Sequence, residues 1–71
     1  SVAKADLFYR DGLLHYRLPE NSTLEVFTLT GQLVVKTQAG MDEGELELDK
    51  GIYMVRVRQQ QGTEVFKILA H

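Results

Sequence analysis

Apolar and polar side chains alternate in the last third of the chain, in two runs separated by Gly62. In the first run, one set of alternate positions is apolar and consists of Tyr53, Val55 and Val57. The other set carries two arginines and consists of Met54, Arg56 and Arg58. A two-residue period with one apolar side is typical of a strand that has one dry and one wet face. We therefore predict a strand that begins just after Gly51.

The second run is apolar on both sides of the alternation. Phe66, Ile68 and Ala70 share one side, and Val65, Lys67 and Leu69 share the other. This pattern predicts a closing strand that is either partly buried on two sides or exposes an apolar stripe. If that strand lies at a sheet edge, its unpaired backbone groups can pair with another protein or with a second copy of the chain, by edge pairing or strand exchange.

Shorter apolar runs, separated by turn residues, fill the first half of the chain. Asp11-Gly12 lies between two such runs and suits a type I′ hairpin, because both central positions of that turn need positive φ. Pro19 to Ser22 is the next expected turn. Strands are expected at 24–28 and 32–37.

A glycine-rich, acidic stretch follows the predicted strand at 32–37. We expect residues 39–44 to form a flexible loop, and residues 45–48 to form a short strand with Leu46 and Leu48 inward. No segment keeps an apolar i, i+3, i+4, i+7 pattern over a dozen residues, so no substantial helix is expected. Short strands with frequent turns predict an all-β sandwich or barrel.

Composition limits the classes of protein that this chain can represent. Its 71 residues make one domain, residues 1–71, and because it begins with Ser1 we expect it to be excised from a longer protein. A net charge of −2 gives no support to binding of nucleic acid or of an anionic membrane. The absence of cysteine excludes disulfides and thiolate chemistry.

Residues capable of catalysis or metal binding lack suitable partners. The acidic residues between 42 and 49 alternate, which places Glu45, Glu47 and Asp49 on the wet side of a strand and favours a solvated face over a calcium site. His15 and His71 have no evident partner. We therefore expect no enzyme activity, no catalytic residues, no metal, no cofactor and no small-molecule ligand.

Three blocks of the sequence together resemble a known family. They are Leu24-Glu25-Val26-Phe27-Thr28-Leu29-Thr30-Gly31-Gln32-Leu33-Val34, then Leu48-Asp49-Lys50-Gly51-Ile52-Tyr53-Met54-Val55-Arg56-Val57, then Gly62 with Lys67-Ile68-Leu69. In order and spacing they resemble the C-terminal sorting domain of the type IX secretion system (Por secretion system) of Bacteroidetes. Many members also open with Tyr-Pro-Asn-Pro, which this chain lacks, and often carry two lysines in the closing strand, where this chain has one.

The resemblance implies a fold and a function. The fold is a small immunoglobulin-like antiparallel β-sandwich of six to seven strands. The function is that of a non-catalytic C-terminal sorting signal, which directs a secreted parent protein from the periplasm through the outer membrane. The implied partners are the outer-membrane machinery and a sortase-like cysteine peptidase, which commonly removes the domain and anchors the cargo at the cell surface; otherwise the cargo is secreted.

The resemblance also implies which residues a partner recognises: Gly51, Tyr53, Val55, Gly62, Lys67, Ile68 and Leu69. For Tyr53, a buried core position with a bonded hydroxyl is favoured over direct recognition. The closing strand is as well suited to completing the core as to contacting a partner.

Two other functions stay open. One is a structural or adhesive immunoglobulin-like accessory module of a surface protein, and the other is an uncleaved domain of a secretion-machinery component. A sugar-binding module usually exposes aromatic platforms, and the absence of Trp argues against that form of the first alternative.

Overall fold

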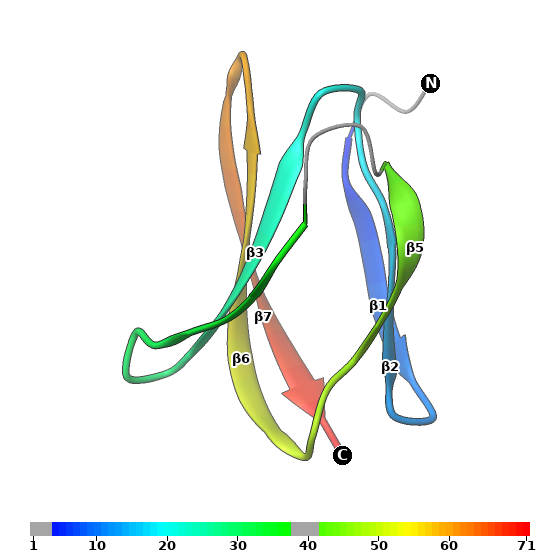
Figure 1. Ribbon diagram of the computed structural model, residues 1–71, viewed down its shortest axis with the longest axis vertical. Coiled ribbons are helices and arrows are strands. Elements are labelled where there is room, and N and C mark those ends of the chain that lie inside the picture. The colour runs from blue at the N-terminus through cyan, green and yellow to red at the C-terminus, as the bar shows by residue number, and fades with distance from the viewer. Residues whose placement is uncertain (1–3, 38–41) are drawn as a thin grey trace.

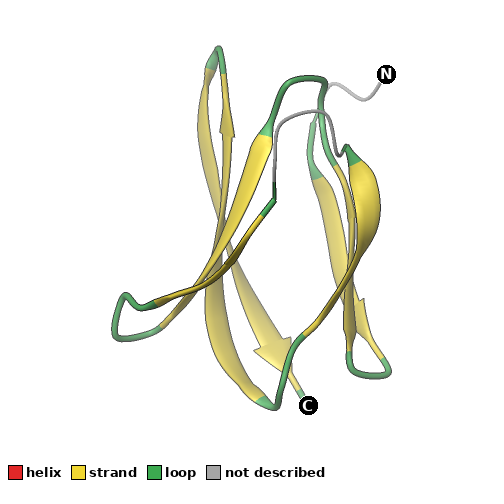
Figure 2. Cartoon of the chain, viewed as in Figure 1, coloured by secondary structure: helices red, strands yellow, loops and turns green. Residues whose placement is uncertain are grey.

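The computed structural model describes residues 4–37 and 42–71, which form seven strands and two layers (Figure 1). The strands are β1 (Asp6–Arg10), β2 (Leu13–Arg17), β3 (Thr23–Thr28), β4 (Leu33–Lys36), β5 (Glu43–Glu47), β6 (Gly51–Gln59) and β7 (Gly62–Ala70). Within the described residues every regular element is a strand (Figure 2). No helix in that part of the chain is long and apolar enough to cross a membrane.

The strands form two antiparallel sheets that face each other. One sheet has the order β1-β2-β5 and the other has the order β4-β3-β6-β7. Figure 1 shows them edge-on, with the four-stranded sheet on the left and the three-stranded sheet on the right. This is the immunoglobulin arrangement with the fourth strand moved to the second sheet. The predicted all-β antiparallel sandwich is therefore confirmed.

The first hairpin forms as the sequence predicts. Arg10 pairs with Leu13, so Asp11 and Gly12 make a two-residue loop between β1 and β2. Their φ angles are 52° and 82°, and two successive positive values are what a type I′ turn requires. This turn fixes the register of the β1–β2 pair.

Strand β5 corrects the prediction of a loop over residues 39–44. Glu43 and Gly44 belong to β5, and residues 39–41 lie outside the described part of the chain. Gly44 lies opposite Tyr16 in the register, and a Cβ atom built on Gly44 would meet the Tyr16 hydroxyl oxygen at 2.7 Å. The missing side chain therefore makes room for the buried Tyr16 ring. Leu46 and Leu48 point inward as predicted.

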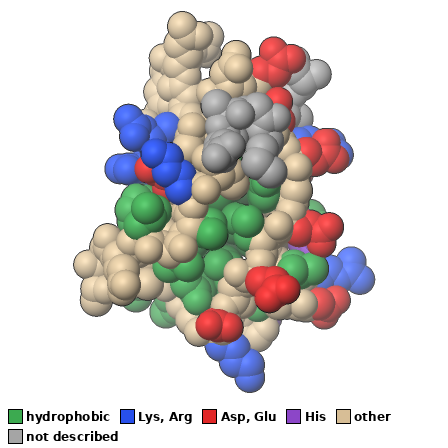
Figure 3. Space-filling model, viewed as in Figure 1, with side chains coloured by type: hydrophobic (Ala, Val, Ile, Leu, Met, Phe, Trp, Pro, Cys, Tyr) green, Lys and Arg blue, Asp and Glu red, His purple; other side chains and the backbone are tan. Residues whose placement is uncertain are grey.

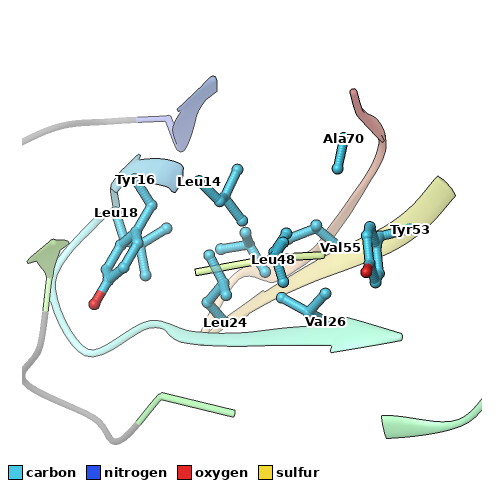
Figure 4. Packing of buried hydrophobic residues seen from close by; sticks show 10 residues of the cluster. Leu14, Tyr16, Leu18, Leu24, Val26, Leu48, Tyr53, Val55 and Ala70 are labelled. Carbon is cyan, nitrogen blue, oxygen red and sulfur yellow. The ribbon is translucent and has the colours of Figure 1, made fainter. Parts of the chain in front are cut away.

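The core lies between the two sheets and takes side chains from both (Figure 4). The buried set comprises Leu14, Tyr16, Leu18, Leu24, Val26, Leu48, Tyr53, Val55, Val57 and Ala70. The predicted alternation of β6 is confirmed, because Tyr53, Val55 and Val57 are all buried. Phe66 and Ile68 of β7 pack against this core from its edge.

One ion pair on the outer face of the four-stranded sheet is largely shielded from water. Glu25 of β3 lies opposite Arg56 of β6, and the Arg56 Nε donates to Glu25 Oε1 at 2.8 Å. The Glu25 side chain is only 7% exposed. The hydrogen bond from Arg56 lowers the pKa of Glu25 below its ordinary value of 4.5, and outweighs burial, which acts to raise it.

We predict that Gly44→Ala destabilises the domain by about 1–3 kcal/mol, because the new methyl group overpacks against Tyr16. Urea unfolding of the 71-residue chain measures the loss. The matched test is the same substitution in a Tyr16→Phe background, where the closest contact, to the hydroxyl oxygen at 2.7 Å, is gone. Equal losses in the two backgrounds would contradict this packing account.

The lowered pKa of Glu25 gives stability a defined dependence on pH. Because the folded pKa is below the unfolded value, the contribution of Glu25 is present above pH 4.5 and is lost as the pH falls through the folded pKa. We expect wild type to exceed Glu25→Gln in stability at pH 7 and the gap to narrow toward pH 3. Urea unfolding across this range measures the gap, and a constant gap would rule the linkage out.

Candidate recognition surface

The predicted recognition residues are brought together by the β6–β7 hairpin. The two strands pair without a shift from Gly51↔Ala70 to Gln59↔Gly62. Strand β6 also pairs with β3, so the hairpin completes the four-stranded sheet and β7 is its edge (Figure 1). All the residues in the predicted set therefore belong to one continuously paired hairpin, β6–β7.

Gly51 and Tyr53 form the corner at which the chain crosses from one sheet to the other. The Tyr53 hydroxyl donates to the Asp49 carbonyl oxygen at 2.7 Å, four residues upstream. Gly51 has φ 154°, and a Cβ atom built on it would lie 3.6 Å from the nearest atom of the Tyr53 ring. A tyrosine near the start of the sixth strand that bonds back to the preceding backbone is the tyrosine corner of immunoglobulin-like sandwiches. This explains the Leu48-x-x-Gly51-x-Tyr53 spacing physically.

The predicted recognition residues differ in how far they reach solvent. Tyr53 and Val55 lie in the core, at 8% and 0% exposure, and Ile68 also faces inward. Lys67 and Leu69 point outward, and Leu69 is 60% exposed. Gly62 lies exposed at the hairpin tip and Gly51 is half-buried at the corner. A partner that meets the folded domain therefore finds three of these residues at the surface: Gly62, Lys67 and Leu69.

Strand β7 exposes the apolar stripe that its sequence pattern allowed. Val65 and Leu69 are 58% and 60% exposed, on the same side as Lys67, while Phe66, Ile68 and Ala70 pack inward. The C-terminal end of β7 lies beside β1, where the rings of Tyr9 and His71 have centroids 6.1 Å apart. The stripe is thus open on the outer face of the sheet.

The three-stranded sheet gives His15 two partners that the sequence did not reveal. The imidazole stacks on the exposed Phe8 ring, with centroids 4.6 Å apart, and its Nδ1 lies 3.9 Å from Glu45 Oε2. Both partners stand directly opposite His15 in the register. The two-residue hairpin at Asp11-Gly12 sets the first pairing, so that turn was the available signal. Glu45, Glu47 and Asp49 are exposed, as predicted.

The family model for the secretion system C-terminal sorting domain matches residues 11–71 of this chain. The chain belongs to that family. Its function is accordingly that of a type IX secretion sorting signal, which implies interaction with the type IX machinery and export across the outer membrane to the surface or the medium. Sorting domains of this kind are in general non-catalytic. Searches of curated proteins and of solved structures give no match.

The stability of the corner formed by Gly51 and Tyr53 should be sensitive to substitution of either residue. We predict that Gly51→Val costs at least ~1 kcal/mol, and more than Gly51→Ala, because side chains with a Cβ rarely adopt φ near 154° and β-branched ones tolerate it least. Tyr53→Phe should cost about 1 kcal/mol through the lost hydrogen bond to Asp49. Urea unfolding of the isolated chain measures all three.

A Gly51→Val domain as stable as wild type would show that the corner does not need glycine. If the variant instead folds normally but fails to direct export of its parent, Gly51 contacts a partner directly.

Proposed function

We propose that the β6–β7 hairpin is the part of this sorting domain that the outer-membrane machinery recognises. The observation that carries the proposal is the exposed stripe of Val65, Lys67 and Leu69 on an edge strand, within the residues that match the family. An edge strand with exposed apolar groups is suited to bind another protein.

The predicted recognition residues then divide into two roles. Gly62, Lys67 and Leu69 contact the partner, because they lie at the surface. Gly51, Tyr53, Val55 and Ile68 act through the fold, since they set the corner and the core that hold β7 in register. The whole of residues 1–71 serves as one sorting domain of a longer secreted protein.

The route proposed for the parent follows from this role as a label. The parent enters the periplasm by a separate signal, the domain folds there, and the machinery binds it and moves the cargo through the outer membrane. A sortase-like cysteine peptidase then removes the domain and anchors the cargo to a cell-surface lipopolysaccharide. The domain contributes no active site to these steps. At high concentration the open side of β7 also pairs or exchanges with a second copy.

The test is export of the parent in cells. We expect deletion of residues 65–71 to leave the parent in the periplasm, and Lys67→Ala to reduce surface display while circular dichroism shows an intact fold. Deletion alone is not decisive, because losing Phe66 and Ile68 from the core can unfold the domain at a cost of several kcal/mol. Lys50→Ala is the matched control, since it removes the same charge from an exposed turn.

Fractionation of cells into periplasm, outer membrane and medium measures the distribution of the parent. Normal display of the truncated parent would overturn the sorting role of the hairpin.

A further inference from the structure

The outer face of the four-stranded sheet is apolar over much of its area. The side chains that point outward from its strands include Phe27, Ile52, Met54, Val65 and Leu69. On β4, Val34 precedes the core-packed Val35 and is exposed. The register sets Phe27 opposite Met54 and Ile52 opposite Leu69, so these groups form adjacent rows. Val34, Val65 and Leu69 are 44%, 58% and 60% exposed. The patch therefore spans the sheet from one edge strand, β4, to the other, β7.

Positive charge is concentrated on the same face. Its outward residues include four cations, Lys36, Arg56, Arg58 and Lys67, and one carboxylate, Glu25. Glu25 is buried and bound by Arg56, which leaves three cations without a carboxylate among the outward residues of these four strands. The outer face of the three-stranded sheet carries four carboxylates, on Asp6, Glu43, Glu45 and Glu47, and two cations, Arg10 and Arg17. Figure 3 shows one group of blue side chains on the left flank and most red ones on the right and below, where further blue side chains lie among them.

A shallow hollow of about 340 Å³ lies within the apolar part of this face. Phe27, Leu29, Met54 and Val65 line it, and the Arg56 guanidinium lies over the Phe27 ring, 5.0 Å from its centroid. An apolar hollow bordered by a guanidinium group is suited to an apolar side chain that has a carboxylate beside it.

We propose that this whole face, and not the β7 edge alone, docks a protein of the secretion machinery whose contact surface is apolar and flanked by carboxylates. The proposal rests on the proposed function, which it deepens by naming the surface and the partner's chemistry. Four strands of up to nine residues make a face of about 20 by 30 Å at most, or up to about 600 Å². That is smaller than the roughly 800 Å² per partner of a stable complex and suits a transient one.

Two other occupants fit this face, an anionic lipid surface and a second copy of the chain, and charge and symmetry favour an acidic protein over both. The three cations without a carboxylate are fewer than the roughly four to eight Lys or Arg residues typical of a site for anionic lipid. The acidic outer face of a second copy complements this one, but the contact would join different faces and would not close into a dimer.

The test measures binding of the fluorescently labelled 71-residue chain to the purified, detergent-solubilised outer-membrane complex. The key variant is Val34→Thr/Arg58→Glu, since both changes lie on the proposed face and neither lies on β7. We expect it to bind at least tenfold more weakly than wild type, and wild-type binding to weaken as salt is raised. The matched control, Glu45→Lys/Glu47→Lys on the opposite face, should stay within twofold. Circular dichroism confirms that each variant is folded.

Four results would overturn the proposal. The first concerns the double variant Val34→Thr/Arg58→Glu, called here the β4–β6 variant. If Lys67→Ala weakens binding but the β4–β6 variant does not, the hairpin is recognised and the rest of the face is not. If wild type does not bind the complex at all, the proposed function fails with it. If wild type binds vesicles of 30% phosphatidylglycerol in phosphatidylcholine and the β4–β6 variant does not, the face binds lipid. If wild type self-associates in sedimentation velocity and the same variant does not, the face binds a second copy of the chain.

Discussion

The fold depends most on the corner where the chain leaves β5 and enters β6. There the Tyr53 hydroxyl binds the Asp49 carbonyl at 2.7 Å, and the Tyr53 ring covers Gly51. Strand β6 lies between β3 and β7, so its register places both neighbours. A one-residue slip at the corner would turn Val55 and Val57 out of the core. The Gly-x-Tyr spacing is therefore a structural device that holds the corner and the register of β6.

The sequence predicted best what depends on near neighbours in the chain. The Asp11-Gly12 hairpin follows from the backbone preference of two residues, and the alternation of β6 follows from its own side chains. The start of β5 was missed because Gly44 resembles a loop residue in isolation. Its place in a strand depends on Tyr16, which lies opposite it and whose ring occupies the space that a side chain on Gly44 would take. Such a pairing between distant segments leaves no local signal.

The candidate surface was predictable only in part for the same reason. Alternation along β7 puts Lys67 and Leu69 on one side of the strand, and the structure shows that this side faces outward. The sequence shows Arg56 and Arg58 on one side of β6, but not that Lys36 joins them, because β5 lies between β4 and β6 along the chain. Only the order β4-β3-β6-β7 brings them onto one face. The overall negative charge of the chain conceals this separation.

The order of the strands also fixes when folding can finish. Strand β7 is the last in the chain, yet it supplies Phe66, Ile68 and Ala70 to the core and its end lies beside β1, the first strand. A chain emerges from the ribosome N-terminus first, and pairings between distant segments form slowly. The sandwich therefore cannot close, wherever it folds, before residues up to 70 have been made. A chain truncated upstream of β7 would carry an open, unfinished sheet, so a closed sandwich reports that every residue before β7 was made.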